Sequence, residues 1–340
     1  MKYPNLRILY AIQGTGNGHL ARATEIVPLL KKLGQTDVLV SGIQGDIKLP
    51  FPVKFKLYGL SFIFGKHGGV SLWQTIRRSK PIRFLHDMRH LPVNDYDVVI
   101  CDFEPVTAWA CRLRKKYCVG LSHQNAVLHP ASPKPTYTDP LGLTILKNYA
   151  PSSVKYGFHF KALDDKNFTP VIRSGIRQTE ARNLGHYTVY LPAFSNEEIE
   201  AVLRTFPQYR WEVFSKHSAK DYRAGSVWFR PVSLDQFSQS FADCTGILCT
   251  AGFETPAEAI YMGKKVCVIP MKKQYEQACN AAFAASLGIR VLSGWQNARN
   301  ELADWLEKDK PFHMEYPNDT FRILEQVVDN AIMAQKNRSN

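Results

Sequence analysis

The chain has 340 residues, with 43 Lys+Arg against 30 Asp+Glu, so its formal net charge is +13. Apolar residues make up 45% and charged residues 21%, which is typical of folded globular proteins and argues against disorder. At about 150 residues per domain, the length predicts two domains. No apolar run approaches the roughly 18 residues that a membrane span needs.

The seven cysteines are odd in number and form no C-x-x-C pair. We therefore expect neither a disulfide framework nor a zinc ribbon. The protein is expected in a reducing, cytoplasmic environment. A signal peptide is not expected, because the first apolar run soon meets a glycine-rich loop.

Positive charge is concentrated in one half of the chain. Residues 1–170 carry a net charge of +12, whereas residues 171–340 carry +1. A field of this sign attracts phosphates, anionic glycans or an anionic membrane surface. We expect a partner of that kind for the first half, with a possible peripheral position on the inner face of a membrane. The alternative is a basic face that serves only solubility.

Strands and helices are expected to alternate along the first half. Short apolar runs predict strands at 6–12, 37–41, 97–101 and 118–121. Helical spacing of apolar residues predicts helices at 19–33 and 105–116, and a Pro-rich stretch predicts a loop at 131–140. Strands of near-continuous apolar residues between helices indicate a parallel sheet covered on both faces.

The second half repeats this alternation after a polar boundary between residues 164 and 184. Expected strands are 188–191, 211–214, 227–229, 246–249, 266–269 and 290–292, and expected helices are 196–204, 234–241, 254–262, 275–287, 298–308 and 319–336. The fold class is therefore α/β, with two tandem Rossmann-like doubly wound domains facing across a cleft. The expected parts are 1–170, 171–318 and a C-terminal helix in 319–340. The cleft, at the carboxyl ends of the strands, is the expected ligand site.

A glycine loop follows the first strand, with Gly14, Gly16 and Gly18 directly before His19. The dinucleotide fingerprint G-x-G-x-x-G and its acidic partner are lacking, and no Lys-Ser/Thr follows, so neither NAD nor a phosphate-binding loop is favoured. His19 lies in the first turn of a predicted helix, whose N-terminus lowers proton affinity. We expect a neutral ring that can accept a proton; a structural histidine is the alternative.

A second loop, Thr250-Ala251-Gly252-Phe253, joins a strand to a helix that begins at Glu254. The free N–H groups of that first turn can hold a diphosphate. Glu258 follows one turn later, and its carboxylate can accept hydrogen bonds from a vicinal ribose diol. Alternatively, Glu258 is a charge favoured by the helix dipole.

With these residues the whole chain resembles the GT-B glycosyltransferases. The stretches GFETPAEA (252–259) and QYEQ (274–277) carry the likeness, and the pattern is similar to the peptidoglycan N-acetylglucosaminyltransferase group and to a branch of small GT-B proteins. The resemblance implies transfer of a hexosyl group from a nucleoside-diphosphate sugar, usually UDP-linked, with inversion. It also implies no cofactor besides the UDP-sugar substrate.

The resemblance assigns contacts to matching residues. Expected donor contacts are Thr250, Ala251, Gly252, Phe253 and Glu254 at and beside the diphosphate, Glu258 at the ribose, Glu276 and Gln277 at the sugar, and Val232 at the base. Expected wall and acceptor contacts are Gly14, Gly16, Asn17, Gly18, His123 and Asn125.

This sequence departs from the family pattern in two places. His123 stands where the family often has a glutamate, so we expect the acceptor side to differ in its chemistry. The loop Leu191-Pro192-Ala193-Phe194-Ser195 is not glycine-serine-rich like the family's loop at this place, so we expect no phosphate contact from it.

Glycosyl transfer needs a base to deprotonate the acceptor hydroxyl. His19 is the first candidate, followed by Asp102 and Glu104 at the carboxyl end of a predicted strand. Asp102 could instead cap the helix that begins at Pro105. The D-x-D pattern at 95–97 precedes a strand and is interpreted as a turn, so we expect no metal.

Residues 61–90 combine aromatic and cationic side chains, namely Phe62, Phe64, Trp73, Phe84, Arg77, Arg78, Lys80, Arg83, Arg89 and His90. This composition suits a membrane-interface surface or a groove for an anionic saccharide or lipid phosphate, such as a cell-envelope precursor. A basic helix with buried aromatics is the alternative, and nucleic acid is disfavoured because no RNA-binding module is present. Two other functions stay open: a nucleotide-sugar epimerase or hydrolase, and a non-catalytic nucleotide-sugar-binding protein.

Overall fold

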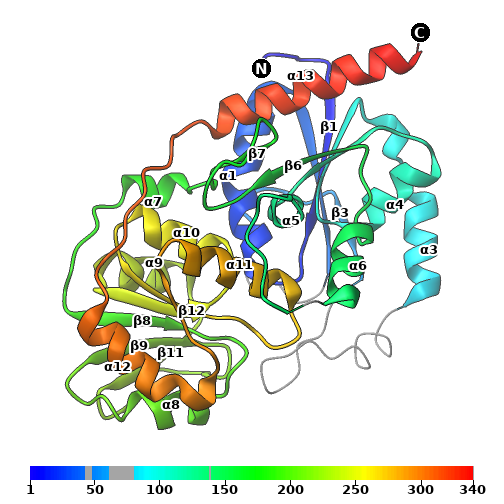
Figure 1. The fold of residues 1–340 in the computed structure, drawn as a ribbon. Helices are drawn as coiled ribbons and strands as arrows, with labels where there is room; N and C mark the ends of the chain where they lie inside the picture. The colour runs from blue at the N-terminus through cyan, green and yellow to red at the C-terminus, as the bar shows by residue number, and fades with distance from the viewer. Residues whose placement is uncertain (43–47, 61–79, 138, 340) are drawn as a thin grey trace.

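The computed structural model describes residues 1–42, 48–60, 80–137 and 139–339. They form two α/β domains, each built on one sheet, and the last helix returns to the first domain (Figure 1). All seven cysteines are buried free thiols. Within the described residues, no helix has both the length and the apolar character that crossing a membrane requires.

The first sheet is parallel throughout and has the order β3-β2-β1-β4-β5-β6-β7. Its strands are β1 (Arg7–Gln13), β2 (Gln35–Ser41), β3 (Phe55–Leu57), β4 (Val98–Asp102), β5 (Cys118–Leu121), β6 (Val154–Phe158) and β7 (Asn167–Phe168). The chain moves outward in opposite directions from β1 and β4. The loops after these two strands therefore open at the topological switch point, where open α/β sheets bind ligands.

Helices cover both faces of this sheet. They are α1 (Asn17–Leu33), α3 (Pro81–His90), α4 (Pro105–Leu113), α5 (His123–Val127) and α6 (Pro140–Asn148), with a 3-10 turn η1 (Val93–Asp95). Alternate residues of β1 enter two cores: Ile8 packs with α1 residues, and Leu9 packs with α3 and α4 residues. Residues 95–97 lie between the end of η1 and the start of β4, as expected of a turn before a strand, and Asp97 accepts a hydrogen bond from the backbone N–H of Arg7.

The second sheet has the order β10-β11-β9-β8-β12-β13-β14, with only β10 antiparallel to its neighbour in the described chain. Its strands are β8 (His186–Tyr190), β9 (Arg210–Ser215), β10 (Tyr222–Ala224), β11 (Val227–Pro231), β12 (Gly246–Thr250), β13 (Lys265–Ile269) and β14 (Arg290–Val291). Its switch point lies between β8 and β12, so the loop before α10 opens there.

The helices of the second half are α7 (Ser174–Gln178), α8 (Asn196–Leu203), α9 (Leu234–Asp243), α10 (Glu254–Tyr261), α11 (Tyr275–Ser286), α12 (Ala298–Lys308) and α13 (Thr320–Ser339), with a 3-10 turn η2 (Trp295–Asn297). Figure 1 shows α10 and α11 on the side of the second domain that faces the first, whereas α8 and α12 lie on the far side. The final helix α13 packs along α1.

Every strand expected from the sequence is present. The sequence did not predict β3, β6, β7 and β10, nor the helices α5, α6 and α7. The expected loop at 131–140 ends one residue early, since Pro140 is the first residue of α6 and its N-cap Asp139 accepts a hydrogen bond from the backbone of Gly142.

Candidate functional site

The loops from the two switch points touch directly. A Cβ added at Gly18, in the first turn of α1, would lie 2.6 Å from Oε2 of Glu254, the first residue of α10. The neighbouring Asn17 amide donates to the Tyr190 hydroxyl at the end of β8, over 3.3 Å. Side chains therefore bridge the cleft that the sequence predicts, and only glycine at position 18 permits this approach.

His19 faces Asp102, which ends β4. The His19 Nδ1 lies 2.8 Å from Asp102 Oδ1. Nδ1 also lies 3.0 Å from Arg22 Nη2, but that nitrogen donates to Asp102 Oδ1 at 2.6 Å. Since a carboxylate can only accept, we assign the ring hydrogen to Nδ1 and the lone pair to Nε2. The amide of Gln124 in α5 donates to this Nε2 over 3.2 Å. The structure thus brings together two of the three predicted base candidates. Nε2 is the ring nitrogen that can take a proton, once a hydroxyl replaces the Gln124 amide on its lone pair.

Charges around the pair determine its protonation. Asp102 is fully buried and accepts from Arg22 Nη2 at 2.6 Å and from the Tyr10 hydroxyl at 3.2 Å. Burial raises the pKa of Asp102, but Arg22 and His19 outweigh it and lower that pKa to about 2.

For His19, burial lowers the pKa, but the charge and hydrogen bond of Asp102 outweigh burial and raise it above its usual value. The expectation that the helix N-terminus dominates this pKa is therefore wrong. A buried carboxylate at hydrogen-bond distance is a stronger influence than a partial charge on the helix end.

Glu104 has a structural role. It is fully buried and caps α4, accepting from the backbone N–H groups of Val106 and Thr107, each at 2.7 Å, and from the Ser41 hydroxyl at 2.6 Å. Burial raises the pKa of Glu104. The structure therefore contradicts both Glu104 as a base and Asp102 as the cap of this helix.

The loop before α10 is hydrogen-bonded to the neighbouring strand β13 and has open space beside Gly252. Ala251 donates its N–H to the Ile269 carbonyl at 2.9 Å. No described atom lies within 4 Å of the place that a Cβ would take on Gly252. Thr250 ends β12, and Phe253 stacks on His123 with ring centroids 3.9 Å apart. Neither Phe253 nor Gly16, the N-caps of α10 and α1, caps its helix with a side-chain hydrogen bond in the described structure.

Glu258 is buried and paired. Its two oxygens accept from Nε and Nη2 of Arg173 at 2.6 and 2.7 Å. Arg173 lies just before α7, in the segment that joins the domains. Each oxygen of Glu258 keeps a further lone pair, so a ribose contact would share the carboxylate with Arg173.

The two predicted sugar-binding residues of α11 point to different partners. Glu276 Oε2 accepts from the Gln124 amide of the first domain at 3.0 Å. Gln277 Oε1 accepts from the backbone N–H of Met271 at 2.9 Å and so holds its own domain's β13–α11 connection. Val232, the predicted base contact, directly follows β11 and precedes the α9 N-cap Ser233, at the same edge of the sheet as Thr250.

His123 and Asn125 are engaged inside the protein. The buried His123 ring contacts the Phe158 carbonyl through Nδ1 at 2.8 Å and Asn280 Oδ1, across the domain interface, through Nε2 at 2.7 Å. Burial lowers the pKa of His123. Asn125 donates to the Tyr156 carbonyl at 3.0 Å. In this structure His123 is an interdomain packing residue and Asn125 ties α5 to β6, rather than either facing an open acceptor site.

The sequence did not predict site roles for Arg22, Gln124 and Asn280. Arg22 follows His19 by three residues on one helix, a spacing that places both side chains on one face and could have revealed it. Gln124 lies in a five-residue helix with no readable period. Across the described residues, no group of three or more His, Cys, Asp or Glu side chains is arranged to hold a metal ion.

Comparison with known proteins identifies the class. The model of glycosyl transferase family 1 matches residues 6–308, so the chain belongs to this family. No curated protein sequence matches the chain.

Solved structures share the fold at low identity. MurG of Acinetobacter baumannii is 14% identical over 95% of this chain and 99% of its own, with a TM-score of 0.55. Phytolacca americana UGT2, complexed with UDP-2fluoro-glucose and pterostilbene, is 14% identical over 97% and 95%, with a TM-score of 0.57. An indoxyl-glucosylating UDP-glucosyltransferase of Polygonum tinctorium is 13% identical over 98% and 94%, with a TM-score of 0.59. The protein is a glycosyltransferase with a MurG-like GT-B fold.

Proposed function

We propose that this glycosyltransferase moves a sugar from a UDP-linked donor to a hydroxyl of an anionic or membrane-associated acceptor, by inversion and without a metal. The observation that carries the proposal is the His19–Asp102 pair at the domain interface. The Nε2 atom of His19 lies beside Gln124 of α5, and the residue directly before His19 is Gly18, which contacts Glu254 of the second domain.

The proposed donor site is the start of α10. Its uncapped N–H groups and the open face of Gly252 suit a diphosphate. Glu258 would contact the ribose while it keeps Arg173, Glu276 would contact the sugar, and Val232 the base. UDP is favoured because a structure with the same fold, Phytolacca americana UGT2, is complexed with UDP-2fluoro-glucose.

In the proposed reaction, His19 Nε2 takes the proton of the acceptor hydroxyl. The hydroxyl oxygen then attacks the anomeric carbon from the side opposite UDP, and the bond from that carbon to the diphosphate oxygen breaks. Asp102 stabilises the imidazolium that forms, as in other histidine–carboxylate pairs. The N–H groups of α10 stabilise the leaving diphosphate, so no metal is needed for that charge.

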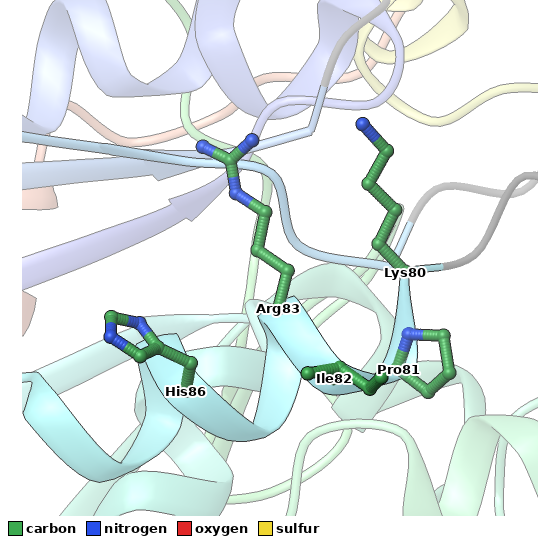
Figure 2. Close-up of a pocket in the computed structure, with 5 residues that line it drawn as sticks. All are labelled: Lys80, Pro81, Ile82, Arg83 and His86. Atoms are coloured by element: carbon green, nitrogen blue, oxygen red, sulfur yellow. The ribbon is translucent and has the colours of Figure 1, made fainter.

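The proposed acceptor surface is the exposed start of α3. Figure 2 shows Lys80 and Arg83 extending from the same side of the helix, and both cations lie over the Tyr58 ring, at 4.8 and 5.5 Å. Ile82 beside them is 83% exposed. Cations next to an exposed apolar side chain suit an anionic interface. Phe84 is half-buried in the α3–α4 core, and the other expected members Phe62, Phe64, Trp73, Arg77 and Arg78 lie outside the described residues.

The test is UDP binding followed by UDP release from a panel of UDP-sugars. We expect the wild-type protein to bind UDP but not NAD, and Glu258→Ala to weaken UDP binding. His19→Gln and Asp102→Asn should keep UDP affinity but lower UDP release by about a hundredfold or more. Donor isomerisation without acceptor would indicate an epimerase. UDP binding without any UDP release would indicate a non-catalytic binding protein. UDP release that is insensitive to both substitutions would show that another group is the base, and either result would contradict the proposal.

A further inference from the structure

We propose that Glu254 is an internal substitute for the donor's diphosphate, and that donor binding transfers Arg22 from this carboxylate to the diphosphate. The inference rests on the proposed function, because it concerns the same site. It adds Arg22 as a diphosphate-binding residue and Glu254 as a group that competes with the donor.

Glu254 is an anion at the place where two helices begin. Its carboxylate lies against Gly18 of α1 while its own backbone opens α10. The first turns of α1 and α10 thus meet, and in the described structure neither has a side-chain cap. Both ends carry positive partial charge, so their contact favours an anion between them. In this structure that anion is Glu254.

Arg22 is fixed so that one nitrogen is directed at this point. The side chain is 1% exposed. Its Nε and Nη2 donate to Asp102 at 3.2 and 2.6 Å, and Nη1 donates to Glu254 Oε1. Asp102 therefore holds the guanidinium in place whether or not Glu254 is present. This is a preorganised receptor for an oxyanion, since guanidinium groups bind carboxylate and phosphate oxygens with the same geometry.

Of the two partners, Glu254 is the one that can leave. Its side chain is 19% exposed and Arg22 Nη1 is its partner, whereas Arg22 is held by the buried Asp102. Beside it, the space around a Cβ on Gly16 or Gly252 has no described atom within 4 Å. A diphosphate placed there would gain Arg22 Nη1 and both helix ends, and it carries more charge than one carboxylate.

The experiment measures binding of UDP and of inorganic diphosphate by calorimetry to wild type, Glu254→Gln and Glu25→Gln. The control is matched, because Glu25 on α1 is also a glutamate that bonds a residue far away in the sequence, accepting from the Ser174 hydroxyl at 2.7 Å. We expect Glu254→Gln to bind both probes about tenfold more tightly, and Glu25→Gln to bind them as wild type does. Arg22→Lys should bind both more weakly.

Unchanged or weaker diphosphate binding in Glu254→Gln would overturn the inference, because Glu254 would then be a structural clasp. Tighter binding of inorganic diphosphate without any UDP binding would support the inference and reject UDP as the donor nucleotide. If neither UDP nor inorganic diphosphate binds to wild type or to Glu254→Gln, the inference is overturned as well.

Discussion

At the residue scale, the proton affinity of His19 depends on one neighbour. Its position at the start of α1 disfavours the charged ring, and burial acts in the same direction. Asp102 lies 2.8 Å away, in an interior where charges interact more strongly than in water, and it reverses the sign. Because the pKa of Asp102 is about 2, this carboxylate is ionised at neutral pH.

The pH dependence of turnover follows from this pair. The base form of His19 exists only above its raised pKa, so we expect the rate to rise with pH through a midpoint above about 6.5. Asp102→Asn removes the charge that raises this pKa, so the midpoint should move to lower pH while the maximal rate falls. UDP release measured between pH 5 and 9 gives both quantities. A midpoint that stays in place in Asp102→Asn would show that another group titrates.

The positions of site residues were predictable where they depend on the order of strands and helices along the chain. His19 lies after β1, and Asp102 is the last residue of β4. Both positions could be found from the alternation of strands and helices. The cap of the helix at Pro105 was offered as an alternative role for Asp102, but the cap is Glu104, which directly precedes Pro105, the favoured first residue of a helix. The contact of Arg22 with Glu254 joins residues 232 positions apart in two domains, and no local pattern encodes it.

At the element scale, α13 ties the chain's end to its beginning. Leu324, Val327 and Val328 are buried in the core that α1 shares with the first sheet. Lys2 and Tyr3 both bond Asp329 of the same helix, at 3.0 and 2.8 Å. The helix thus completes the outer layer of the first domain although it follows the second domain in the sequence.

We expect Leu324→Ala to lower the free energy of unfolding by about 3 kcal/mol, since it opens a cavity under α13. Met333→Ala, at a side chain that is 61% exposed on the same helix, should change it by less than about 0.5 kcal/mol. Urea unfolding followed by circular dichroism measures both. Equal small effects would show that α13 is not part of the cooperative fold.

Elements could be predicted when their hydrophobic pattern was long enough to read. The central strands β1, β4 and β12 are almost wholly buried and contain continuous apolar runs. By contrast, β3, β7 and β10 have two or three residues and lie at or near sheet edges, so no period of two can develop. Helix α5 has five residues, and tertiary contacts rather than propensity hold it.

At the scale of the whole molecule, the charge is divided between the domains. The +12 of residues 1–170 against +1 of residues 171–340 gives the molecule a basic end and a nearly neutral one. The exposed Lys80 and Arg83 belong to the basic end. If net charge alone attracts the protein to an anionic surface, the place of a charge reversal does not matter. If a specific surface on α3 binds it, only a charge reversal on α3 weakens the binding.

We expect the protein to sediment with vesicles that contain phosphatidylglycerol and not with vesicles of phosphatidylcholine alone. Lys80→Glu/Arg83→Glu should weaken this binding by at least about tenfold, since each basic residue near an anionic surface contributes about 1 kcal/mol. Arg299→Glu/Lys310→Glu is the matched control, because it makes the same change in net charge at exposed positions of the second domain. Equal losses in the two variants would mean that net charge alone attracts the protein. Binding to neutral vesicles would mean that apolar side chains do so. Loss in the α3 variant alone would place an anionic acceptor or its membrane at the basic end, on the domain that carries His19.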